Sequence, residues 1–203
     1  MKEFSIAMAL VDYLPVACFL LASVLLLKDC YPNAGKTAYA LLSAGLISIV
    51  CAGTLKATYK LLYAANICDF AALSDMFFPV QSIGFLLSGI GMLLFLFQTK
   101  KRMLSVAPPL YAGTFLFVGA MVLGLAFLDA GLCILSARRK KYGLIALFVL
   151  SFLCSLGMGY LSSQDFTQAS MNWIAEGINV VGQGTLLLGV LLLRRTNPTQ
   201  EAV

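Results

Sequence analysis

The sequence predicts an all-α integral membrane protein with six transmembrane helices. The chain has 203 residues, of which 61% are hydrophobic and only 11% are charged, whereas soluble domains carry about 25% charged residues. Apolar runs recur along the whole chain, and each is long enough to cross a hydrocarbon core about 30 Å thick. These runs account for nearly every residue, so we expect one membrane domain, 1–203, and no soluble domain.

The first three spans are separated by short polar connections. The first span, about 4–27, ends before a turn that contains Pro32. The second, about 37–63, is followed by a connection that contains Asp69. The third is expected at about 75–97. Proline, glycine and small polar residues in these connections are typical of turns.

The last three spans are bounded by basic clusters. The cluster 100–102 separates the third span from the fourth, about 110–137. The cluster 138–141 leads to the fifth, about 142–161, and the sixth is expected at about 166–193. Such clusters set topology and contact anionic lipid headgroups, so we infer a lipid bilayer partner and no nucleic acid.

Short connections favour antiparallel neighbours, and six alternating spans place both termini on one side. That side would hold nine of the 14 Lys and Arg residues. The positive-inside rule therefore favours a plasma (inner) membrane protein with both termini in the cytoplasm.

A weak internal repeat relates the two halves of the chain. At one constant offset, Tyr39, Ser48 and Cys51 match Tyr142, Ser151 and Cys154, and at a second offset Gly84 and Gly91 match Gly182 and Gly189. Tandem units of three alternating spans must have opposite orientations, which predicts a 3+3 inverted repeat like that of many transporters. Chance similarity between apolar helices is the alternative interpretation.

The sixth span carries a polar stripe. Asn172, Glu176, Asn179 and Gln183 recur at helical spacing, so one face of the helix holds all four. Such a face is costly against lipid and must meet other helices or a water-filled cavity. Gln81 marks a similar polar face on the third span. The stripe indicates a binding site, although a ladder of hydrogen bonds between helices would use the same residue types.

Four more charged residues are expected inside the membrane. Asp12, Asp129, Lys56 and Lys60 fall at similar depths in their spans, which predicts a network of charge pairs, because an unpaired charge is costly there. Alternatively, Asp12 or Asp129 belongs to a gated substrate or proton path. Pro15, just after Asp12, predicts a kink in the first helix, because proline removes a helical hydrogen bond and clashes with the preceding turn. Such a kink beside an acidic residue either forms a cation or amine site or bends the helix around a neighbour.

Glu176 is expected to stand apart from that network. In an alternating arrangement it lies nearer the opposite side, where no span carries Lys or Arg at its depth. A buried carboxyl group without a cationic partner tends to hold a proton or to recruit a cation. Glu176 is therefore expected to be the protonatable or cation-binding group of the site.

These observations favour a small transporter or permease for a small solute or cation, acting as a homodimer or within a larger membrane complex. Its expected binding residues are Glu176, Asn172, Asn179, Gln183, Gln81 and Asp12. The alternative is a membrane sensor or complex-assembly subunit without transport activity. We expect no enzyme, cofactor or metal site, because the chain has no histidine and its six cysteines form no C-x-x-C pair. An intramembrane lipid-modifying enzyme is the least favoured alternative.

Overall fold

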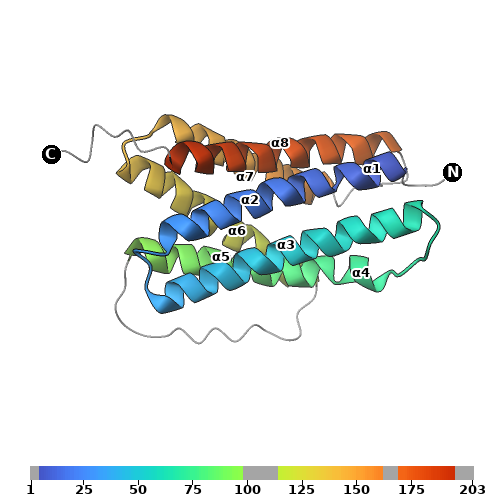
Figure 1. Cartoon of the computed structure of the whole chain (residues 1–203), viewed down its shortest axis with the longest axis horizontal. Coiled ribbons are helices and arrows are strands. Elements are labelled where there is room, and N and C mark those ends of the chain that lie inside the picture. Colours follow the sequence, from blue (N-terminus) through green and yellow to red (C-terminus); the bar gives the residue numbers. More distant parts are fainter. Residues whose placement is uncertain (1–4, 98–113, 162–168, 195–203) are drawn as a thin grey trace.

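A computed structural model of the chain describes residues 5–97, 114–161 and 169–194, and it is helical throughout apart from short connections (Figure 1). Its helices are α1 (Ile6–Val11), α2 (Tyr13–Cys30), α3 (Lys36–Ala64), α4 (Ala72–Asp75), α5 (Phe77–Phe97), α6 (Thr114–Arg138), α7 (Gly143–Leu161) and α8 (Ala169–Arg194). Six segments are long and apolar enough to cross a membrane, with α1 and α2 forming one and α4 and α5 another. The prediction of an all-α protein with six such helices is confirmed.

The expected span boundaries agree with the helices to within a few residues. The second span, expected at about 37–63, is α3, and the fifth, expected at about 142–161, is α7. Parts of three expected spans, namely residue 4, 110–113 and 166–168, lie outside the described residues.

Two prolines explain why the first and third spans are each divided. Pro15 and Pro79 are both the third residue of a helix, α2 and α5, and the helical hydrogen-bond pattern is interrupted just before each helix, at Asp12 and Met76, although both residues keep right-handed helical dihedral angles. A proline nitrogen cannot bond to the carbonyl four residues earlier, and its ring clashes with that carbonyl. In the first span, where the sequence predicts a kink, the helix is divided at Asp12, which places an acidic side chain at the interruption.

The membrane-spanning helices form a closed ring in the order α2, α3, α5, α6, α7 and α8, since each packs on the next and α8 packs on α2. At one interface, a Cβ atom on Gly45 of α3 would overlap the backbone of Ser88 and Gly84 of α5. These small residues let the two helix backbones approach closely, which is how many membrane helices associate.

Helices α5 and α6 run in the same direction. Gly124 of α6 lies against the backbone of Phe85 and Leu86 in α5, and Gly131, further along α6, lies against Met92. At the ends of both helices, the Arg138 guanidinium donates to the Leu96 carbonyl over 3.0 Å. Residue numbers thus increase together along this interface, which is parallel packing.

This parallel packing differs from the arrangement expected from the sequence. Helices α2, α3 and α5 and helices α6, α7 and α8 form two up-down-up units that run in the same sense, so the expected inverted orientation does not fit (Figure 1). The beginning of α1 and the end of α8 lie at opposite ends of the bundle, rather than on one shared side (Figure 1). The connecting residues, 98–113, lie outside the described ranges.

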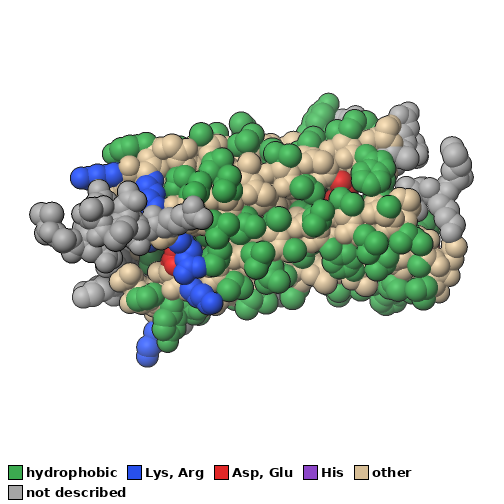
Figure 2. Space-filling view, turned by 45° about the horizontal axis from the view of Figure 1, so that its top comes forward, with side chains coloured by type: hydrophobic (Ala, Val, Ile, Leu, Met, Phe, Trp, Pro, Cys, Tyr) green, Lys and Arg blue, Asp and Glu red, His purple; other side chains and the backbone are tan. Residues whose placement is uncertain are grey.

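The two ends of the bundle differ in charge. At the end where α2, α6 and α8 finish, which we call the basic end, Figure 2 shows the Lys and Arg side chains gathered together. Several of them cap the carboxyl ends of helices: Arg139 and Lys141 donate to the carbonyls of Leu193 and Leu192. Cations are favourable at these sites because the last helical carbonyls lack partners within the helix.

The half of the bundle nearer the basic end is filled by apolar side chains. We call them the apolar plug; its residues include Leu26, Leu46, Met92, Leu96, Leu128, Leu132, Phe148 and Val190, all buried. They come from every spanning helix, so the interior of the ring is closed in this half. The opposite half is more open.

Candidate functional site

A cavity of about 340 Å³ lies inside the helix ring, in the half away from the basic end. All six spans contribute to its wall, and it reaches the helix ends there, because Phe77 begins α5 and Gly159 belongs to the last turn of α7. A volume of this size is at the lower end of the range for small-molecule sites.

All six residues expected to bind a ligand line this cavity: Asp12, Gln81, Asn172, Glu176, Asn179 and Gln183. The four polar residues of α8 share the face that the sequence spacing assigned to them, and Asn172 and Glu176 are buried. Gln81 reaches the same space from α5. The stripe faces a cavity rather than only packed side chains.

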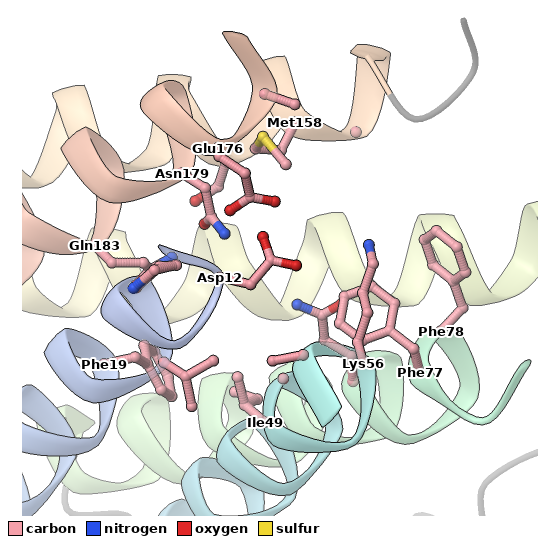
Figure 3. Close-up of a pocket in the computed structure, with 18 of the residues that line it drawn as sticks. Asp12, Phe19, Ile49, Lys56, Phe77, Phe78, Met158, Glu176, Asn179 and Gln183 are labelled. Atoms are coloured by element: carbon pink, nitrogen blue, oxygen red, sulfur yellow. The ribbon is translucent and has the colours of Figure 1, made fainter. Parts of the chain in front are cut away.

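Lys60 links two carboxyl groups at the centre of the site. Its Nζ lies 2.6 Å from Asp12 Oδ2 and 3.0 Å from Glu176 Oε1, and both acidic residues are 6% exposed. The contact joins α3, the break between α1 and α2, and α8. Figure 3 shows the carboxyl groups of Asp12 and Glu176 pointing toward one another.

The expectation that Glu176 has no cationic partner is therefore wrong. It rested on an alternating topology, in which α8 would begin at the end opposite to Asp12. Because α8 instead runs parallel to α2, Glu176 and Asp12 lie at the same depth, and Lys60 reaches both. The predicted pairing of Asp12 with a lysine of the second span is confirmed.

Three acceptor oxygens around this ion-pair cluster are buried without a hydrogen-bond partner among the described residues. They are Asp12 Oδ1, Glu176 Oε2 and Gln183 Oε1. Buried polar atoms of proteins nearly always have a partner, so each such atom calls for an explanation. All three residues line the cavity, and a bound molecule with hydrogen-bond donors could satisfy them.

Lys56 faces the cavity one helical turn from Lys60 but joins no ion pair within the described part of the chain. Its Nζ lies 4.1 Å from the centre of the Phe77 ring and 6.0 Å from that of Phe78. A cation over an aromatic face gains only about 0.5–2 kcal/mol. Lys56 thus contributes a positive charge to the cavity that no neighbouring carboxylate neutralises directly, contrary to its expected place among the charge pairs.

Asp129 is also not in the expected network. It is 4% exposed, its Oδ1 has no hydrogen-bond partner, and no described Lys or Arg is within ion-pair distance. Helices α5 and α7, which flank α6, carry no charged residue. Asp129 lies one helical turn beyond Leu125, which lines the cavity, so its carboxyl group is on the side of the apolar plug.

Sequence reasoning missed the apolar wall of the cavity. Phe19 and Phe85, whose ring centres are 6.4 Å apart, line it together with Ile49, Met121 and Leu125. Such residues have no distinguishing pattern in helices that are apolar on every side. The only sequence feature that indicates a cavity in this region is Pro15, which follows the acidic residue Asp12 and interrupts the helix beside it.

The arrangement can hold a small polar molecule and exchange ionic contacts with it. Two carboxylates and two ammonium groups face one partly apolar space inside a membrane-spanning ring. Across the described residues, no three His, Cys, Asp or Glu side chains are grouped as a metal site would need. No protein-family model, curated protein or solved structure matches the chain.

Proposed function

We propose that this protein is a small membrane transporter that binds a small solute at the Asp12–Lys60–Glu176 cluster. The observation that carries the proposal is a cavity, lined by all six spans, that reaches charged groups inside the membrane-spanning region. Intramembrane ionisable residues that face a cavity typically mark substrate or ion pathways. A subunit that served only to bind a partner would need no such internal space.

The geometry supports a simple mechanism. A solute that enters the cavity competes with Lys60 for the two carboxylates and so alters the contact that joins α2, α3 and α8. Release on the other side requires the apolar plug to separate, and rocking of one helix unit against another is the usual way in transporters. Asp129 then becomes accessible along the path, since it lies one turn past the cavity wall.

We further propose that the basic end faces the cytoplasm of the plasma membrane. The described basic residues at that end are Lys28, Lys36, Arg138, Arg139, Lys140, Lys141 and Arg194. The other two described basic residues, Lys56 and Lys60, line the cavity. Because Lys and Arg near span ends are retained on the cytoplasmic side, the cavity would lie toward the extracytoplasmic side.

Cysteine labelling tests this orientation. Cys68 is exposed in the connection after α3, and Asn33 and Tyr142 are exposed at the basic end. In a protein with Cys68 as its only cysteine, we expect a membrane-impermeant maleimide to label intact cells. In an otherwise cysteine-free protein, Asn33→Cys and Tyr142→Cys should react only after the membrane is permeabilised.

The same experiment tests the parallel packing of α5 and α6. In the alternating topology expected from the sequence, Cys68 and Tyr142 would lie on the same side of the membrane. Equal reactivity of these two positions in intact cells would therefore contradict the arrangement. Reactivity of Tyr142→Cys alone would reverse the proposed orientation and leave the parallel packing intact.

Transport itself is tested with purified protein in liposomes. The liposomes are incubated with a mixture of small metabolites, and their contents are compared with those of protein-free liposomes by mass spectrometry. We expect at least one solute to accumulate, and Glu176→Gln to reduce its uptake about ten-fold or more. Losing a hydrogen bond to a charged group costs about 1.5–3 kcal/mol, and 1.4 kcal/mol is a factor of ten.

Asp29→Asn is the matched control for that experiment. Asp29 is a carboxylate of α2 that pairs with Arg194 at the basic end, 2.8 Å away, and both side chains are partly exposed. Its loss should leave uptake unchanged, because exposed ion pairs contribute little. If no solute accumulates, the transporter proposal fails, and a sensor or assembly role is favoured instead. If Glu176→Gln takes up the solute as fast as Asp29→Asn does, the protein transports, but Glu176 does not bind the solute.

A further inference from the structure

We propose that the cavity recognises a small zwitterion, an amino acid with an apolar side chain, which places its ammonium group at Asp12 and Glu176 and its carboxylate at Lys56. This inference rests on the proposed transport function and specifies the substrate class. It follows from how positive and negative charges, unpaired oxygens and apolar surface are distributed around the cavity.

The carboxylate pair provides the site for an ammonium group. Two carboxylates share the single ammonium of Lys60, so this part of the cavity keeps an excess of one negative charge. Asp12 Oδ1, Glu176 Oε2 and Gln183 Oε1 are unsatisfied acceptors that line the same space. A primary ammonium has N–H donors and no acceptor, which suits Asp12 Oδ1 and Glu176 Oε2, the unsatisfied oxygens of the two carboxyl groups that Lys60 links.

Lys56 provides the site for the carboxylate. Figure 3 shows its side chain beside Phe77 and Phe78, on the far side of Asp12 from Gln183. Since it joins no ion pair within the described residues, it adds an excess of one positive charge on that side of the cavity. Lys56 can therefore bind an anionic group of a ligand without first breaking an existing ion pair.

A zwitterion fits this charge pattern better than an amine or an acid alone. A bound amine without a carboxylate would leave Lys56 without a counter-ion. A bound carboxylate without an amine would leave the excess negative charge of Asp12 and Glu176 without a counter-ion. In a medium of low dielectric constant, an uncompensated charge is far more costly than in water. A molecule with both charges compensates both excesses and adds no net charge to the membrane interior.

The rest of the cavity wall favours a ligand with an apolar side chain. Phe19, Phe85, Met121 and Leu125 line the cavity beyond the charged groups. Its volume of about 340 Å³ suits a single small molecule rather than a peptide. The headgroup of phosphatidylethanolamine also carries an ammonium and an anion, so lipid is the competing source of this chemistry.

Binding to the purified protein tests the proposal. The protein is placed in nanodiscs of phosphatidylcholine, and isothermal titration calorimetry is carried out with phenylalanine, leucine, phenethylamine and 3-phenylpropanoate. We expect phenylalanine or leucine to bind, and phenylalanine to bind about ten-fold or more tightly than phenethylamine and 3-phenylpropanoate, which each lack one charged group. Nanodiscs that contain phosphatidylethanolamine test the lipid, which would compete with the amino acids if it were the true ligand.

Two variants assign the carboxylate contact. Lys56→Met should weaken phenylalanine binding about ten-fold or more while leaving phenethylamine binding unchanged, because only the former has a carboxylate. Lys28→Met, at an exposed lysine near the basic end, should change neither. Thermal unfolding of each variant verifies that it is folded.

Several results would overturn the inference. They are the absence of binding by both amino acids, equally tight binding of phenethylamine, an unchanged phenylalanine affinity in folded Lys56→Met, and competition by phosphatidylethanolamine. These outcomes are separable from a failure of the proposed function. Amino acid binding without uptake would contradict the proposed transport function but support the proposed ligand class. Uptake of other solutes without amino acid binding would support transport and contradict the ligand class.

Discussion

Replacing Lys60 with methionine is expected to lower the free energy of unfolding by about 3–5 kcal/mol, the cost of breaking a buried ion pair by removing one partner. Lys60 is the only described cation within ion-pair distance of Asp12 and Glu176, at 2.6 and 3.0 Å. Without it, two buried carboxyl groups would face each other unpaired. Since whole domains are stable by about 5–15 kcal/mol, this loss is a large part of the total stability.

The origin of this loss can be isolated with a triple variant. Asp12→Asn, Lys60→Met and Glu176→Gln together remove all three charges while keeping the side chains similar in size. Replacing a buried ion pair with neutral groups is often close to neutral for stability. We therefore expect the triple variant to regain most of the stability lost in Lys60→Met, as measured by thermal unfolding in detergent, while remaining inactive in transport.

Lys56→Met is the matched control. It makes the same substitution one helical turn away, at a lysine that contacts aromatic rings and joins no ion pair in the described ranges. Losing a cation–π contact should cost about 0.5–2 kcal/mol. Equal destabilisation by Lys60→Met and Lys56→Met would contradict the structural role assigned to the Asp12–Lys60–Glu176 cluster.

The polar stripe of α8 could be predicted from the sequence because it depends only on helical periodicity. Asn172, Glu176, Asn179 and Gln183 occupy one face in any helix, whatever that helix packs against. An acidic residue among amides also excludes a lipid-facing position. The structure places all four at the cavity, so the lining residues required no tertiary information.

The partners of the charged residues could not be predicted in the same way. Which lysine meets which carboxylate depends on the direction of each helix, and short connections favour a simple reversal at each one. With a reversal at every connection, Glu176 has no partner and Asp129 has two possible partners, Lys56 and Lys60. The parallel packing of α5 and α6 reverses both conclusions, because it brings α8 into line with α2.

Periodicity is also uninformative for the helices that lack a polar stripe. In α6, the polar residues Asp129 and Ser136 are too few to form a stripe and apolar residues occur on all sides, so the pattern does not identify the face that meets α5. The contact is made by Gly124 and Gly131, and glycines of this kind are indistinguishable in sequence from Gly119, which has open space around it. Close approach of two backbones depends on both helices, so the sequence of one helix does not show which of its glycines makes the contact.

Gly124→Ala is expected to separate α5 from α6 and to be strongly destabilising. A Cβ atom at Gly124 would overlap the backbone of Phe85 and Leu86, and backbone, unlike the end of a flexible side chain, cannot rotate away. Overpacking costs about 1–3 kcal/mol and sometimes more. Thermal unfolding in detergent, followed by the loss of the monodisperse peak in size-exclusion chromatography, measures the effect.

Gly119→Ala on the same helix is the control, because a Cβ atom there would meet nothing within 4 Å. Alanine is a better helix former than glycine by about 1 kcal/mol, so this variant should be as stable as the parent or slightly more stable. The two substitutions are chemically identical and differ only in whether α5 lies beside the glycine. If they unfold at the same temperature, α5 is not packed against this face of α6, and the parallel interface that aligns Glu176 with Asp12 loses its support.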